Sequence, residues 1–180
     1  MRSKFFLASI LLTPILVVVF STLYFTTGMS PEGTKNNGEF FKSYFNFNQF
    51  KDSRGEQDLI NFDDGKWVLS VYVTDIEKST ESIYLMRQLN VALNRDINKL
   101  KRAVVIQDMK ILEDQLIDYP RTQAIIDAEG KLYKKLLDAG NESFFLEQKI
   151  FIIDPYGRAV MFFPVSMDPK LILKDLKVLI

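Results

Sequence analysis

The polar residues best placed for chemistry lie in one short segment, residues 74–81, between a predicted strand and a predicted helix. The candidates within it are the carboxylates of Asp75, Glu77 and Glu81 and the hydroxyl group of Ser79. In α/β proteins the reactive loop follows the carboxyl end of a strand and precedes a helix. Helix capping is the plainest interpretation, because a helix N-terminus favours negative charge and Ser79 fits an N-cap. The alternative is a hard-cation site, although the segment lacks the ligand density of a calcium loop.

The chain lacks the two side chains on which thiol chemistry, soft-metal binding and proton transfer near neutral pH mostly depend. Its 180 residues include no cysteine and no histidine. We therefore expect no catalytic residue, no metal site of the usual soft ligands and no cofactor. The 23 basic residues balance 23 acidic ones, so no positive excess supports nucleic-acid binding.

A long uncharged segment lies near the N-terminus. No charged residue occurs from Phe5 to Pro31, and residues 5–24 are strongly apolar. At about 1.5 Å per residue a helix of this length spans roughly 30 Å, the hydrocarbon thickness of a bilayer. No small-x-small cleavage pattern follows it, which favours a retained transmembrane anchor (residues 1–28) over a cleaved signal peptide.

The charges that flank this segment predict its orientation. Arg2 and Lys4 precede it, and the first charged residue after it is Glu32. Basic residues stay on the cytoplasmic side, so the N-terminus is expected in the cytoplasm. In a bacterium the chain would be a single-pass inner-membrane protein with a periplasmic domain.

The region after the anchor divides into an extension and a folded domain. Residues 29–56 contain linker chemistry and then an aromatic stretch from Phe40 to Phe50. These aromatic side chains either lie among lipid headgroups or pack along the domain. We favour packing, because no Lys/Arg surplus suits a lipid-surface helix. Residues 57–180 are long enough for one domain with its own core.

Strands and helices alternate along this domain. Residues 67–74, 103–107 and 122–127 are predicted as strands, and 79–100, 109–117 and 131–139 as helices. We expect Gly140 to close the last of these helices as a left-handed cap.

The last third predicts a β-hairpin and a final helix. Asp154, Pro155 and Gly157 occupy the turn positions typical of type I, between apolar segments 150–153 and 160–163. Asp168 fits the N-cap of the helix that follows. The complete order predicts an α/β thioredoxin-like sandwich, a central mixed sheet flanked by helices.

Three strings of the sequence resemble a proteobacterial branch of the Sco-like (Sco/SenC) membrane-anchored thioredoxin-fold family. They are PEGTKNNGE at 31–39, IYLMRQ at 83–88, and the stretch from Asp154-Pro155 through Asp168-Pro169 to Leu176. The resemblance covers nearly the whole chain in order. It implies a thioredoxin-like fold and a role near cytochrome c oxidase, whose copper centre Sco proteins help to assemble.

The same resemblance locates the positions of the family's copper ligands. Sco proteins bind copper through a Cys-x3-Cys pair after the first central strand and a histidine before the hairpin. The cysteine positions match Asp75 and Ser79, and the histidine position falls near Leu146. None of the three ligands is retained, so the resemblance implies that copper transfer and dithiol exchange by the family's mechanism are lost.

These observations predict a non-enzymatic module that is tethered to the lipid bilayer through residues 5–24. We expect the 75–81 loop to be its interaction surface, with respiratory oxidase subunits or assembly factors as partners. The alternative is a metal-binding protein that uses the carboxylates of the Asp75–Glu81 loop. A third hypothesis is carboxylate acid/base chemistry, because Asp75 and Asp108 each follow a predicted strand.

Overall fold

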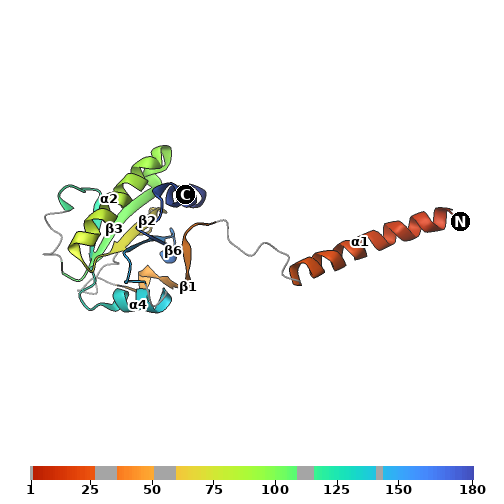
Figure 1. Ribbon diagram of the computed structural model, residues 1–180, viewed down its shortest axis with the longest axis horizontal. Helices are drawn as coiled ribbons and strands as arrows, with labels where there is room; N and C mark the ends of the chain where they lie inside the picture. The colour runs from red at the N-terminus through yellow and green to blue at the C-terminus, as the bar shows by residue number, and fades with distance from the viewer. Residues whose placement is uncertain (1, 27–35, 51–59, 109–115, 141–143) are drawn as a thin grey trace. The chain divides into compact units, whose positions relative to one another are not determined.

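The computed structural model describes residues 2–26, 36–50, 60–108, 116–140 and 144–180 (Figure 1). The chain forms two compact units, Met1–Lys35 and Asn36–Ile180. The first contains helix α1 (Arg2–Thr26), in which Pro14 lies and whose large apolar side chains are exposed wherever the structure describes them. Within the described ranges, no helix combines the length and the apolarity needed to span a membrane.

The second unit is built on a mixed sheet of six strands in the described part of the chain. They are β1 (Glu39–Asn46), β2 (Trp67–Tyr72), β3 (Leu100–Ile106), β4 (Thr122–Ile126), β5 (Lys149–Ile153) and β6 (Arg158–Pro164). Their order across the sheet is β1-β6-β5-β2-β3-β4. Strands β2, β3 and β4 run parallel, whereas β5, β6 and β1 pair antiparallel with their neighbours. The predicted mixed sheet is confirmed.

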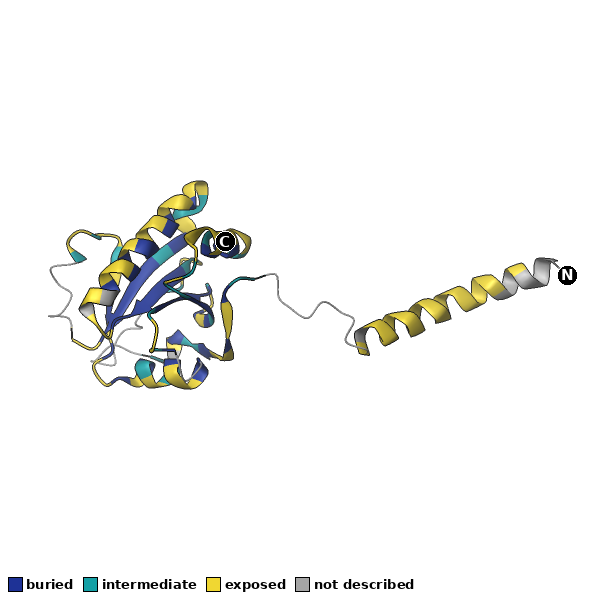
Figure 2. Cartoon of the chain, in the orientation of Figure 1, coloured by how far each residue is buried: buried dark blue, intermediate teal, exposed yellow. Residues whose placement is uncertain are grey.

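Helices cover both faces of this sheet. Helices α2 (Ile76–Ala92) and α5 (Pro169–Leu179) lie over one face, and α4 (Lys131–Ala139) lies over the other (Figure 1). Along β3, Val104 and Ile106 pack into the apolar core beneath α2 and α5, while Ala103 and Val105 pack on the α4 side. Figure 2 shows the result, a buried sheet between helices whose outer faces are exposed.

Two predictions about helix ends are wrong for reasons of backbone conformation. The helix expected over 79–100 begins at Ile76 and ends at Ala92. It ends early because Asn94 adopts a left-handed φ of 54°, and the 3-10 helix η2 (Asn94–Lys99) follows. Gly140 is extended, not left-handed, and the left-handed glycine of α4 is its N-cap, Gly130, with φ 63°. The helix expected over 109–117 falls mostly outside the described residues.

The predicted hairpin and final helix are confirmed. In the turn between β5 and β6, the Gly157 N–H donates to the Asp154 carbonyl at 2.9 Å. The buried Asp154 carboxylate accepts from the N–H groups of Tyr156 and Arg158. Asp168 caps α5 by accepting from the Lys170 N–H at 2.9 Å.

The aromatic stretch packs into the domain, as we favoured. Strand β1 pairs with β6 at the edge of the sheet, and the 3-10 helix η1 (Phe47–Gln49) follows it. Phe41, Phe45 and Phe47 are buried. The Phe45 ring contacts the rings of Phe41 and Phe47, and each of these two also contacts the Phe151 ring. The compact unit begins at Asn36, whereas the sequence predicts an extension over 29–56.

The start of β1 is joined to α5 by a buried carboxylate. Asp175 accepts hydrogen bonds from the Asn37 N–H at 2.6 Å, the Gly38 N–H at 2.9 Å and the Asn37 side-chain amide at 2.7 Å. A Cβ atom at Gly38 would overlap the Phe163 ring, so only glycine allows this close approach. Two of the strings that carry the Sco-like resemblance therefore meet in space.

Candidate functional site

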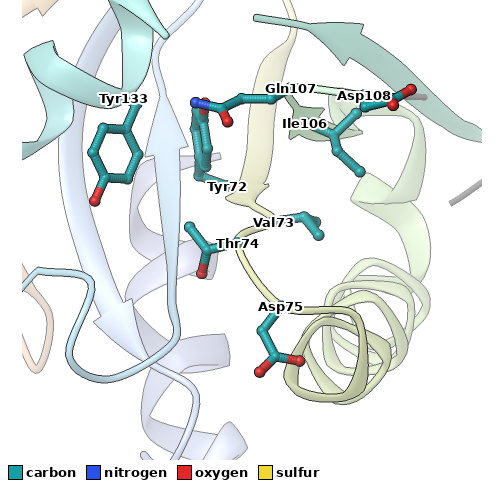
Figure 3. Close-up of a pocket in the computed structure, with 8 residues that line it drawn as sticks. All are labelled: Tyr72, Val73, Thr74, Asp75, Ile106, Gln107, Asp108 and Tyr133. Atoms are coloured by element: carbon teal, nitrogen blue, oxygen red, sulfur yellow. The ribbon is translucent and has the colours of Figure 1, made fainter. Parts of the chain in front are cut away.

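A cavity opens at the carboxyl ends of the parallel strands β2 and β3 (Figure 3). Its volume is about 280 Å³. Its walls come from both strand ends, the start of α2 and helix α4: Tyr72, Val73, Thr74, Asp75, Ile106, Gln107, Asp108 and Tyr133. Ligands of α/β folds bind outside the carboxyl ends of parallel strands. The cavity is therefore the candidate site, and the predicted reactive loop begins in its wall.

Asp75, not Ser79, is the N-cap of α2. The Asp75 carboxylate accepts from the Glu77 N–H at 2.9 Å. Ser79 lies one turn inside the helix, where its buried hydroxyl donates to the Asp75 carbonyl. The prediction of helix capping is confirmed, but its assignment to Ser79 is wrong because the cap lies four residues earlier, at Asp75. Of the two positions that the Sco-like resemblance aligns with cysteines, Asp75 is exposed at the cavity and Ser79 is buried.

The remaining carboxylates of the loop do not gather around a common point. Glu77 and Glu81 are exposed on α2, and neither lines the cavity. Within the described ranges, no group of three or more acidic side chains is arranged to hold a metal ion. The geometry gives no support to the hypothesis of a carboxylate metal site at Asp75, Glu77 and Glu81.

The inner wall of the cavity is held by a buried tyrosine and aspartate. The Tyr72 hydroxyl donates to the Asp127 carboxylate at 3.0 Å, and the Tyr133 backbone N–H donates to the same oxygen at 3.0 Å. Asp127 follows β4, so this carboxylate joins the end of β2 to the first turns of α4. The Tyr133 ring also packs edge-on against Tyr72, with ring centroids 5.6 Å apart.

The electrostatic surroundings keep Tyr72 protonated. Burial raises the pKa of the Tyr72 hydroxyl, and the Asp127 carboxylate raises it further. A side-chain hydrogen bond from Gln107 acts in the opposite direction but is the weaker influence. Tyr72 therefore serves as a neutral hydrogen-bond donor rather than as an ionised base.

Sequence reasoning missed this pair, since 55 positions separate Tyr72 from Asp127. Asp127 ends the strand predicted over 122–127, and Tyr72 lies two residues before the end of the strand predicted over 67–74, which is the one local signal that either lies near this edge of the sheet. The order of β2, β3 and β4 in the sheet brings Asp127 beside the Tyr72 hydroxyl.

Leu146, near which the Sco-like resemblance puts a histidine, lies in the turn before β5 and is 82% exposed. Strand β5 runs antiparallel to β2, so its beginning lies at the carboxyl end of β2. Gln148 in the same connection donates to the Tyr72 carbonyl at 3.0 Å. The structure thus places Leu146 at the same edge of the sheet as Asp75, although it does not line the cavity.

Asp75 and Asp108 both line the cavity, as the acid/base hypothesis requires. Figure 3 shows their carboxylates at separate ends of the cavity and directed away from one another. Paired carboxylate chemistry needs two groups that face one substrate. The arrangement therefore favours recognition by separate polar groups over acid/base catalysis by this pair.

Comparison with known proteins agrees with the fold. The family model described as "Transmembrane-like, thioredoxin-like, C-terminal domain" matches residues 72–180. No curated protein is similar in sequence to the chain.

Several solved structures share the architecture. A cysteine-to-serine mutant of PrxQ from Xylella fastidiosa aligns with a TM-score of 0.50 at 18% identity, over 81% of this chain and 98% of its own. BsSco, described as a member of the Sco family of cytochrome c oxidase assembly proteins, aligns with a TM-score of 0.50 at 11% identity, over 79% and 95%. Copper-bound ScoI from Bradyrhizobium japonicum gives 0.47 at 14% identity, over 82% and 100%. The likeness to the two structures with a TM-score of 0.50 shows a thioredoxin-like fold and, at these identities, nothing beyond the fold.

Proposed function

Because the chain belongs to the transmembrane-like, thioredoxin-like C-terminal domain family, we propose that it is a non-catalytic, membrane-tethered interaction module. It binds a partner at the carboxyl ends of β2 and β3. The candidate process is respiratory cytochrome c oxidase assembly, on the resemblance of the sequence to Sco-like proteins.

One observation carries the proposal: the edge where a thioredoxin-like fold places its reactive thiol keeps an open cavity without any thiol. Asp75 stands at the helix start and caps it, and the buried Ser79 hydroxyl is engaged within the helix. Thiol–disulfide exchange needs a thiolate, and the sequence contains no cysteine. What this edge offers is shape together with the exposed polar groups of Thr74, Gln107 and Asp108.

The surroundings of the cavity suit a protein partner. Exposed Leu146 lies at the same edge of the sheet, so an apolar side chain accompanies the polar cavity. The ring of Tyr133, which lines the cavity, stacks on the Phe145 ring with centroids 4.4 Å apart, and the Phe145 ring also contacts Tyr72. Protein interfaces combine an aromatic or apolar centre with a polar rim. The rigid aromatic packing would present such a surface at small entropic cost.

Helix α1 is the proposed tether. Its large side chains are apolar and exposed, and Arg2 and Lys4 precede the uncharged segment. We place the N-terminus in the cytoplasm and the second unit in the periplasm of a bacterium. Carbonate extraction and protease protection of the full chain in membrane vesicles test the tether. Release of the protein by carbonate would show surface association instead of insertion and would refute the spanning helix.

Site-specific photocrosslinking in intact membranes tests the partner surface. A photoreactive residue at Thr74 or Leu146 should capture oxidase subunits or assembly factors. The matched control is Val178, an apolar α5 residue that is 77% exposed against 82% for Leu146 and does not line the cavity.

Two results would contradict the proposal. Identical crosslinked products from Leu146 and Val178 would show that the cavity edge has no specific partner. An oxidase assembled at normal levels in a strain that lacks the protein would remove the proposed process while leaving the surface itself to be judged by the crosslinks.

A further inference from the structure

Arginine side chains gather at the amino ends of the parallel strands, the opposite end from the cavity described above. Arg102 lies near the start of β3, Arg121 directly precedes β4, and Arg87 belongs to α2. Two adjoining cavities of about 210 and 260 Å³ open here. Arg102 and Arg121 line both cavities, and Arg87 lines the smaller one.

Arg102 is the residue of this cluster that most needs a partner. Its side chain is buried, with 6% of the residue exposed, and its Nη1 atom has no hydrogen-bond partner among the described residues. The Thr122 hydroxyl, on the β4 residue that pairs with Arg102, is likewise buried without a partner there. Buried polar groups are nearly always satisfied, so two neighbouring exceptions indicate a missing polar ligand.

The charges around Arg102 increase this need. Burial lowers the pKa of Arg102, and the positive charges of Arg87 and Arg121 lower it further. Within the described ranges, no ion pair links any of these three arginines to a carboxylate. By contrast, Lys101 in the larger cavity is paired with Asp64 at 2.7 Å.

The cavity walls are fixed by the fold. Asn90 of α2 donates to the Ile97 and Leu100 carbonyls, both at 3.0 Å, which holds η2 against α2. The Arg87 guanidinium lies 5.7 Å from the centre of the Tyr119 ring, so an aromatic face supports it. The site therefore requires little reorganisation to receive a ligand.

We propose that Arg87, Arg102 and Arg121 form a binding site for a doubly charged oxyanion of the phosphate-monoester class. Guanidinium groups match phosphate oxygens with two parallel hydrogen bonds, and they remain charged. The three arginines face one carboxylate among the residues that line the smaller cavity, Asp118, which leaves an excess of two positive charges. A dianion neutralises that excess, and the Arg102 Nη1 gains the acceptor it lacks.

Calorimetric titration of the full-length protein in detergent tests the site with inorganic phosphate as the first probe. We expect saturable binding with one ligand per chain and a rise in Tm with phosphate concentration. Glycerol 3-phosphate and mixed micelles with phosphatidic acid present the same headgroup, free in solution or fixed to a lipid. Whichever of these two probes binds more tightly shows whether the natural phosphate group is free in solution or part of a lipid.

Substitutions separate a built site from general attraction. Arg121→Gln and Arg102→Leu should each weaken phosphate binding roughly tenfold or more, because each removes charge-assisted hydrogen bonds. Arg95→Gln removes the same charge from an exposed η2 residue that lines neither cavity, and should leave binding unchanged. Without phosphate, Arg102→Leu should raise Tm, because it removes a buried unpaired charge.

The result that overturns the proposal is the absence of saturable phosphate binding at millimolar concentrations in the folded wild-type protein. Equal weakening by Arg95→Gln and Arg121→Gln would also overturn it, since the attraction would then follow net charge alone. A lower Tm for Arg102→Leu without phosphate would show that the guanidinium already has a structural partner, and would count against the site.

Discussion

Replacing Tyr72 with phenylalanine tests the buried hydrogen bond behind the candidate site. The substitution removes the hydroxyl that donates to Asp127 at 3.0 Å and leaves the ring in place. Asp127 is 7% exposed, so water replaces the lost donor poorly. Hydrogen bonds to charged groups contribute about 1.5–3 kcal/mol, and we expect Tyr72→Phe to lower the free energy of unfolding by about 2 kcal/mol at neutral pH.

The same bond predicts how this difference changes in alkali. Burial and Asp127 raise the pKa of folded Tyr72, whereas an unfolded tyrosine ionises at about pH 10. Above that pH the unfolded state binds fewer protons than the folded state, so stability falls as pH rises. The contribution of Tyr72 is complete below about pH 10 and declines by about 1.4 kcal/mol per pH unit above it. The wild-type advantage of about 2 kcal/mol in the free energy of unfolding should therefore vanish at about pH 11.5.

Urea denaturation of the wild-type and variant chains, followed by circular dichroism from neutral pH into alkali, measures this difference. Tyr44→Phe is the control, because Tyr44 is 63% exposed, and at neutral pH it should change stability by less than about 0.5 kcal/mol. A wild-type advantage that stays constant through pH 11 would refute the reasoning, since Tyr72 would then titrate alike in both states.

Three further substitutions, each measured by urea denaturation, test a buried carboxylate, a closely packed glycine and a helix cap. Asp175→Ala should lower the free energy of unfolding by about 2–4 kcal/mol, because it leaves three N–H donors at the start of β1 without their acceptor. Rapid amide exchange along β1 would show where stability is lost, and a decrease below about 1 kcal/mol would contradict the prediction. Gly38→Ala should cost about 1–3 kcal/mol through overlap with the Phe163 ring, and a neutral result would show that β1 can shift at no cost. Asp75→Ala should cost about 1 kcal/mol by removing the α2 cap, whereas Glu81→Ala, one turn inside the helix, should stay within about 0.5 kcal/mol. Equal effects of these two would argue against the cap.

Local patterns in the sequence predicted most of the elements. The buried strand β2, the amphipathic helix α4 and the β5–β6 turn are each specified by residues close together in the chain. Predictions failed where a single backbone conformation decided the outcome. Asn94 ended α2 early, and the left-handed glycine of α4 proved to be Gly130 rather than Gly140.

The candidate site was predicted in part. The sequence located the loop at Asp75, because the carboxyl end of an interior strand is where α/β folds bind ligands. It could not distinguish exposed Asp75 from buried Ser79, since that depends on where α2 begins. Nor could the sequence show that Glu77 and Glu81 do not line the cavity.

The sequence by itself determined which chemistries are available, because a residue type that is missing from the chain cannot be supplied by folding. The absence of cysteine and histidine is such a fact, and so are the uncharged N-terminal segment and the balance of charge. Tertiary structure alone decided which distant groups meet: Tyr72 with Asp127, and Asp175 with Asn37, which are 55 and 138 positions apart. Strand order and the packing of helices on the sheet bring such pairs together, and both are set over the whole domain rather than by any local pattern.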